Sequence, residues 1–228
     1  MSRRLTTILL STAAGLMLLS HAGKSGAQSI LATGPEAEVT GDGLHRVNPS
    51  IMENAWVKPD LDLSVYSRIY FVPVAVQFRD VAERRYTART RDTAEQFFVT
   101  EQRKARLRDL FGEAFHEAVG EIESYELSEE VGRDVLIVRG LLADVISGVP
   151  PDDAGSVSSS VRWAWEASIV LELRDSMSND ILARTADRER IDGPFDVGAM
   201  MGVTASVAQS WSRLLAGRVE EVSELGAE

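Results

Sequence analysis

The sequence predicts an α+β fold: a mostly antiparallel sheet of four to five strands with two long helices packed on one face. Two segments carry apolar residues at helical spacing. Four further segments have the apolar, β-branched composition of strands. The last two of these are separated only by a polar turn at 175–180, which is typical of a hairpin. Adjacent hairpin strands favour helices layered on one face of an antiparallel sheet.

The N-terminal segment 1–27 predicts a secretory signal peptide. Arg3 and Arg4 precede an apolar run at 5–19, and small residues end the segment at Ala27. The run is shorter than the roughly 20 residues of a membrane-spanning helix, so we expect cleavage after Ala27 and a periplasmic product. The alternatives are a buried N-terminal helix or an uncleaved signal that keeps the protein in the membrane. A lipid anchor needs a cysteine at the cut site, and the chain contains none.

The segment 28–60 is interpreted as an irregular lead-in before a single domain at 61–228. It is rich in Gly and Pro turn signals and has no sustained apolar period, with Trp56 as its one large apolar anchor.

A first strand is expected at 68–78, where Pro73 indicates a bulge or an edge.

An arginine-rich segment at 79–108 leads into the first helix. Thr93 with Gln96 fits a capping box, Thr100 is an alternative start, and Gly120 is a plausible end. The cluster is the only clearly basic region of the mature chain, and it could present a surface for an acidic partner. Acids are interspersed, so a solvated helix face with ion pairs is the alternative. The possible partner-binding residues are Arg84, Arg85, Arg89 and Arg91.

The second half of the chain predicts three strands and a final helix. The segment 134–146 is apolar on both faces, whereas 161–174 alternates strictly and 181–190 returns as its antiparallel partner. Asp196 is a candidate N-cap for the last helix. The buried stripe of that helix is expected to comprise Met200, Val203, Val207, Trp211, Leu214 and Leu215.

Several of these segments, in this order and spacing, resemble a bacterial envelope family catalogued as domain of unknown function 3313. The resemblance covers about residues 56–192. It is carried by Trp56-Val57-Lys58-Pro59, Ile69-Tyr70-Phe71-Val72-Pro73-Val74, the strand at 134–145, and Ser168-Ile169-Val170-Leu171-Glu172-Leu173-Arg174-Asp175. It implies an exported protein with no established activity and no catalytic residues to carry over. Its members are often lipoproteins, and this chain departs from them in lacking the cysteine.

Composition narrows the function classes. The formal net charge is −11, and removal of Arg3, Arg4 and Lys24 with the signal makes the mature chain −14. A nucleic-acid-binding protein needs a basic face, so nucleic acid is not an expected partner. Without cysteine, disulfides and thiolate chemistry are excluded.

No motif predicts a reaction centre or a cofactor. His116-Glu117 could begin a zinc-protease motif, but Gly120 stands where the second histidine is needed. Gly41-x-Gly43 lacks the third glycine of a dinucleotide-binding loop. Asp152 and Asp153 form an adjacent acid pair that is more typical of a solvated loop than of a glycosidase. We therefore expect no catalytic residue, no metal ligand and no cofactor.

Asp144 is the most unusual charged residue, because it interrupts an apolar strand and burial of a charge is costly unless it is paired. Arg139, Arg162 or Arg188 could be its partner, in a structural ion pair or in a site.

The leading hypothesis for the function is a non-enzymatic module that binds an unknown envelope protein or polymer. One alternative is a glycan hydrolase whose acids converge only in the fold. The other is a structural subunit of an envelope oligomer, using the last helix or the Trp163–Trp165 face, which we expect to be core.

Overall fold

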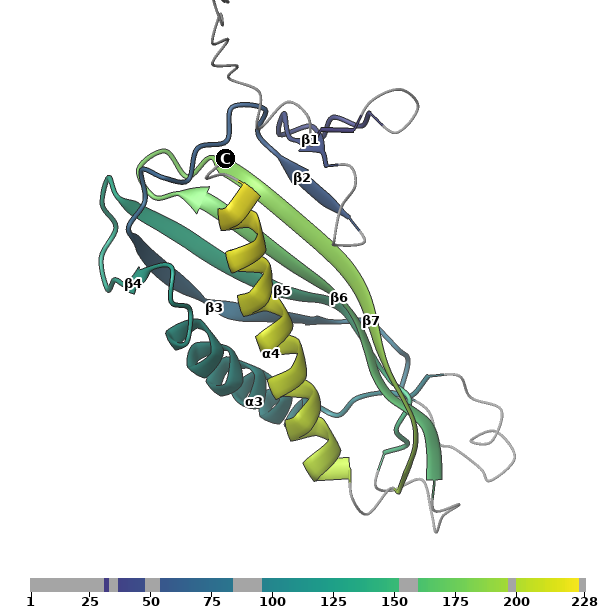
Figure 1. Ribbon diagram of the computed structural model, residues 1–228. Coiled ribbons are helices and arrows are strands. Elements are labelled where there is room, and N and C mark those ends of the chain that lie inside the picture. The colour runs from purple at the N-terminus through teal and green to yellow at the C-terminus, as the bar shows by residue number, and fades with distance from the viewer. Residues whose placement is uncertain are drawn as a thin grey trace, which may run out of the picture.

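The structure, a computed structural model, describes residues 31–32, 37–47, 54–83, 96–151, 160–196 and 200–225. They form a seven-stranded mixed sheet with strand order β1-β2-β7-β6-β5-β3-β4 and two helices (Figure 1). The prediction of a mostly antiparallel sheet of four to five strands is therefore wrong in strand number and in pairing. The α+β character itself is supported, because helices and strands both make up the fold.

The parallel pairing comes from a crossover in the first half of the domain. Strand β3 (Arg68–Phe78) is followed by helix α3 (Glu101–Gly120), the short strand β4 (Glu126–Leu127) and strand β5 (Val135–Ser147). Both β4 and β5 pair with β3 in parallel. A helix between two strands carries the chain back to the starting end of the sheet, so the second strand runs in the same direction as the first.

The antiparallel half is the long hairpin expected from the sequence, with longer strands. Strand β6 (Ser160–Asp175) pairs with β5 on one side and with β7 (Ile181–Asp196) on the other. Asp196 is the last residue of β7. The sequence assigned it to the cap of the last helix, but helix α4 begins only at Met200 and ends at Leu225.

Two short strands extend the sheet beyond β7. Strand β1 (His45–Arg46) pairs with β2 (Ala55–Val57), and β2 pairs with β7 so that Trp56 lies opposite Arg184. Part of the segment expected to be an irregular lead-in is thus built into the sheet. The sequence signal was missed because strands of two and three residues are too short to show a period.

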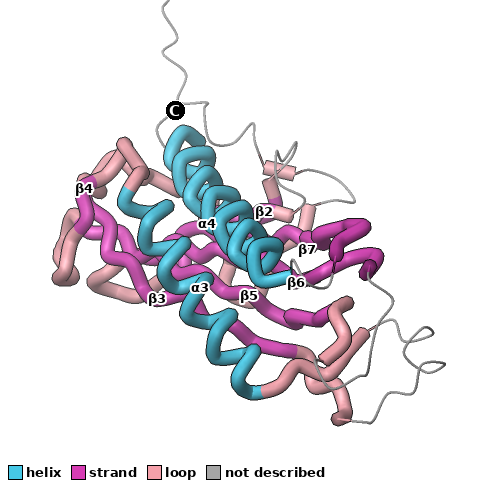
Figure 2. Tube along the Cα trace, turned by 90° about the horizontal axis from the view of Figure 1, so that it is seen from below, coloured by secondary structure: helices cyan, strands magenta, loops and turns pink. Residues whose placement is uncertain are grey.

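Both helices cover the same face of the sheet, side by side (Figures 1 and 2). Thr100, the alternative start, caps α3: its side chain accepts a hydrogen bond from the backbone N–H of Arg103 at 3.3 Å. Phe111 of α3 stacks on Trp211 of α4 with 5.5 Å between ring centroids. Among the described helices, none is both long enough and apolar enough to cross a membrane.

The core lies between the helices and the sheet. The alternation of β6 turns its apolar set toward the helices, and Trp165 is only 2% exposed. Its indole N–H donates to the Thr204 hydroxyl of α4 at 3.2 Å, which fixes the first half of α4 on the sheet. Trp163 is half-buried and packs against the backbone of Gly148. Burial of Trp165 in the core removes the main support for an oligomer built through the Trp163–Trp165 face.

Candidate functional site

The predicted partner-binding arginines, Arg84, Arg85, Arg89 and Arg91, lie outside the described residues. The proposed cleavage site at Ala27 and the acid pair Asp152-Asp153 also lie outside them. Two histidines, His45 and His116, are described. His116 is exposed on α3, and His45 is half-buried in β1. These two histidines are on different elements, so the fold does not make a site from them.

Asp144 lies at a β-bulge, on the sheet face opposite the helices. Its φ is 55°, and the register of β5 with β6 shifts between Ala143 and Ile146. Arg79 donates to the Asp144 carboxylate through Nε at 2.7 Å and also through Nη2. Arg188 donates to the same carboxylate at 2.9 Å. Of the three predicted partners, Arg188 is the observed one, and Arg79 was missed because it lies just beyond the far end of β3.

The surroundings of Asp144 hold it ionised. Hydrogen bonds from Arg79, and then from Arg188, lower the pKa of Asp144 to about 2 against the opposing effect of burial. Arg188 also contacts Glu166 at 2.6 Å, so two acids and two arginines balance one another. A glycosidase acid instead needs a raised pKa and an unobstructed carboxyl group. The cluster is arranged as a structural ion-pair network, which leaves the hydrolase hypothesis without support from these residues.

A second ion-pair network occupies the same face of the sheet. Glu172 contacts Arg174 at 2.7 Å and Arg184 at 2.9 Å, and Arg184 also reaches Asp42 at 2.9 Å. Burial opposes ionisation of Glu172, but the hydrogen bonds from the two arginines lower its pKa overall. Among the described residues, no group of three His, Cys, Asp or Glu side chains is placed to hold a metal ion.

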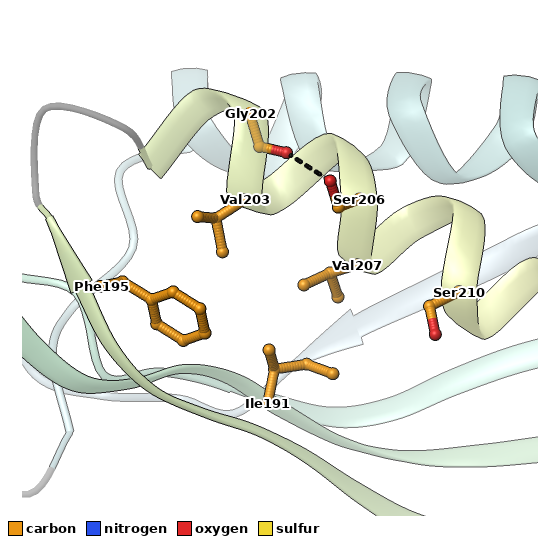
Figure 3. A pocket seen from close by; sticks show the side chains of 7 residues that line it. All are labelled: Ile191, Phe195, Gly202, Val203, Ser206, Val207 and Ser210. Atoms are coloured by element: carbon orange, nitrogen blue, oxygen red, sulfur yellow. Dashed lines mark hydrogen bonds between the residues drawn. The ribbon is translucent and has the colours of Figure 1, made fainter.

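A pocket of about 520 Å³ lies on the helix side, between the end of β7 and the beginning of α4 (Figure 3). Its size is in the range of about 300–1,000 Å³ that is typical of ligand sites. Strand β7 contributes Ile191 and Phe195. Helix α4 contributes Gly202, Val203, Ser206, Val207 and Ser210.

The chemistry of this pocket suits binding and offers no reactive group. Its side walls are aliphatic and aromatic, and none of its lining residues is titratable in the physiological range. The Ser206 hydroxyl donates to the Gly202 carbonyl at 3.0 Å, so that serine is satisfied within the helix (Figure 3). The arrangement can therefore exclude water from an apolar group and hold it by burial of apolar surface.

The pocket was not predicted from the sequence. Val203 and Val207 were assigned to the buried stripe of the last helix, and Val207 is buried whereas Val203 is half-exposed. Gly202, Ser206 and Ser210 recur every four residues beside them, which places small side chains along one line of the helix. This spacing was the signal in the sequence for the helical wall of the pocket. The wall made by β7 was missed because residues 191–196 were not assigned to a strand.

No protein-family model and no curated protein matches this chain, so the resemblance to domain of unknown function 3313 stays a prediction. Solved structures align only loosely. A PelC dodecamer from Paraburkholderia phytofirmans, carrying a single substitution, aligns at 10% identity and TM-score 0.34, over 73% of this chain and 92% of that one. A Xanthomonas campestris protein of the family DUF330 aligns at 12% identity and TM-score 0.36, over 72% and 88%. A putative neuraminyllactose-binding hemagglutinin homolog from Helicobacter pylori aligns at 11% identity and TM-score 0.38, over 73% and 88%. At these TM-scores the alignments carry no argument about fold or function.

Proposed function

We propose that the protein is an exported, non-enzymatic binding module of the cell envelope that holds an apolar group in the pocket between α4 and β7. The observation that supports this most directly is the lining of the pocket. It combines ligand-site volume with apolar walls and no general acid, base or ionisable nucleophile. The arginines at 84, 85, 89 and 91 remain a predicted second surface for a partner.

Export is the first half of the proposal, and it rests on the signal-like segment 1–27. When the full chain is expressed in a bacterium with two membranes, we expect the protein to be recovered from the periplasm with Gln28 as its first residue. N-terminal sequencing and intact mass measure this. A chain that retains Met1 in the inner-membrane fraction contradicts cleavage and a periplasmic product.

Binding is the second half, and filling the pocket should abolish it. We expect N-phenyl-1-naphthylamine, an apolar dye that fluoresces when water is excluded, to bind the mature protein saturably. Gly202 lines the pocket, and a Cβ built there meets no atom within 4 Å. The Gly202→Leu variant should therefore fold, and it adds a bulky side chain at the wall of the pocket. We expect it to weaken dye binding by about tenfold or more, measured by fluorescence titration.

Gly217 provides the matched control. It lies on the same helix, a Cβ there also meets no atom within 4 Å, and it does not line the pocket. Glycine is about 1 kcal/mol less favourable than alanine in a helix interior, so neither leucine variant should lower the thermal midpoint. We expect Gly217→Leu to bind the dye as the unsubstituted protein does. Equal binding by Gly202→Leu, or no binding by the unsubstituted protein, would contradict the proposal.

A further inference from the structure

Four of the five large apolar side chains that are exposed in the described part of the chain lie at one end of the sheet. They are Val65, Leu127, Val131 and Met177, each 51–63% exposed, and we call them the apolar tips. They belong to the segment before β3, to β4 and the loop after it, and to the turn between β6 and β7, which lie together at the β4 end of the sheet (Figure 1). Single exposed apolar residues are common, but a group of them is typical of a surface that contacts another molecule.

Hydrogen bonds hold the loops that carry the apolar tips together. The Tyr66 hydroxyl donates to the Asp175 carboxylate at 2.8 Å, which joins the segment before β3 to the β6–β7 turn. The Gly132 N–H donates to the Ser176 hydroxyl at 3.2 Å, which joins the loop after β4 to the same turn. The turn itself is closed by Asp175, whose carboxylate accepts a hydrogen bond from the Met177 N–H at 3.0 Å. The apolar tips are therefore held in place before any partner binds, so little conformational entropy is lost on binding.

The surroundings of the apolar tips are acidic. The segments 58–68, 126–134 and 175–180 contain eight acidic and three basic residues. Two of the three bases, Lys58 and Arg68, already pair with acids of these segments, at 3.2 Å and 2.7 Å. Four exposed acids have carboxylates that contact neither a base nor a hydrogen-bond donor among the described residues: Asp60, Glu126, Glu129 and Glu130. A basic contact surface is complementary to this end of the molecule, whereas an anionic lipid surface is repelled by it.

We propose that the apolar tips are the docking surface for a partner protein whose contact face is apolar in the middle and basic at the rim. Burial of the apolar side chains supplies affinity, and the charges of the rim steer the approach of the partner. The surface is separate from the pocket, because β7 runs from the turn that holds Met177 to Ile191 and Phe195 of the pocket. A strand rises about 3.3 Å per residue, so the two places lie roughly 30 Å apart. The inference is therefore independent of the proposed function.

The test measures binding of the mature protein to three fluorescein-labelled peptides by anisotropy titration. The first has about 14 residues, with leucine at helical spacing and lysine elsewhere, so it presents an apolar stripe with a basic rim. The second has the same composition with the leucines spread around the helix, and the third carries glutamate in place of lysine. We expect the first peptide to bind about tenfold or more tightly than either of the others. Higher salt should weaken its binding, because salt screens the attraction between exposed charges.

Two double variants separate the apolar and the acidic parts of the surface. Val131→Ser with Met177→Ser should weaken binding of the first peptide about tenfold or more, because apolar burial is lost. Glu129→Gln with Glu130→Gln should weaken it about two- to fivefold and reduce the effect of salt. All four side chains are exposed, so both variants should be as stable as the unsubstituted protein.

Matched controls change the same kinds of side chain elsewhere. Val39 is the fifth exposed apolar residue, and Glu113 and Glu117 are exposed acids of α3. We expect Val39→Ser, and Glu113→Gln with Glu117→Gln, to bind the first peptide as the unsubstituted protein does. Gly202→Leu should also bind it normally, because that substitution lies at the pocket.

The contrary outcomes are distinct. Equal binding of the first two peptides, or an equal loss in the tip variants and their controls, would mean that only the net charge of −11 attracts the peptide, and would overturn the proposal. Loss of binding in Gly202→Leu would place the peptide in the pocket instead. Binding to vesicles of phosphatidylglycerol that Met177→Ser weakens would assign the apolar tips to a lipid surface. Dye binding without peptide binding would remove this inference and leave the proposed function standing, and the reverse result would do the opposite.

Discussion

Replacement of Trp165 by alanine is expected to lower the free energy of unfolding by about 3–5 kcal/mol, as large-to-small substitutions of buried aromatic residues do. Trp165 is among the largest fully buried side chains of the core. Its indole N–H donates to Thr204 at 3.2 Å, so the substitution removes a contact between β6 and α4 as well as apolar burial. Urea unfolding followed by circular dichroism measures the change.

Trp165→Phe separates the two contributions. Phenylalanine retains most of the buried ring area but cannot donate to Thr204, whose hydroxyl still donates to the Met200 carbonyl at 2.8 Å. We expect a smaller loss, of about 1–2 kcal/mol, from the missing hydrogen bond and the reduced volume. If Trp165→Ala unfolds at the same urea concentration as the unsubstituted protein, the packing of α4 on β6 described above is wrong.

Substitution of Gly148 by alanine should be nearly as damaging, with an expected loss of about 3 kcal/mol. A Cβ at Gly148 would lie 2.4 Å from the Trp163 carbonyl oxygen and 2.6 Å from its Cδ2. The first of these atoms belongs to the backbone of β6, and the Gly148 N–H donates to the Ala164 carbonyl at 2.9 Å. Neither strand can therefore move away without breaking the ladder.

Gly112→Ala is the control for Gly148→Ala. Gly112 lies in α3, and a Cβ there meets no atom within 4 Å. Because alanine is the stronger helix former, this variant should gain about 0.5–1 kcal/mol in the same urea measurement. Similar unfolding of the two variants would mean that the contact between Gly148 and Trp163 is looser than the structure shows.

The local elements of the fold were largely predictable from the sequence, and its long-range pairing was not. The alternation at 161–174 indicated β6 with the correct buried face, because a period of two is a property of the strand itself. Gly120 ended α3 as expected, and the start proved to be Thr100, the alternative, rather than the capping box that included Gln96. The parallel pairing of β3 with β5 depends on the path of the chain through α3. Hydrophobic periodicity contains no information about that path.

The candidate site was also predictable only in part, because some of its contacts depend on the long-range pairing of strands. Arg188 was one of three arginines predicted as possible partners of Asp144, and it is the one of the three that pairs with it. Arg79 follows β3, and it reaches Asp144 only because β3 and β5 run in parallel. The pocket is formed by the last residues of β7 together with the first turns of α4. Assigning Asp196 to the helix cap shortened the strand and hid the wall that Ile191 and Phe195 make.

The pairing of β2 with β7 has a consequence for the order in which the chain folds. The β6–β7 hairpin joins neighbours in sequence and can form early, whereas β2 comes from near the beginning of the described chain and β7 from near its end. Contacts between distant segments form slowly, because the entropy of closing a long loop is lost first. The hairpin therefore spends part of every folding event with the whole outer edge of β7 uncovered. During that interval the partly folded chain is open to wrong strand pairing between molecules.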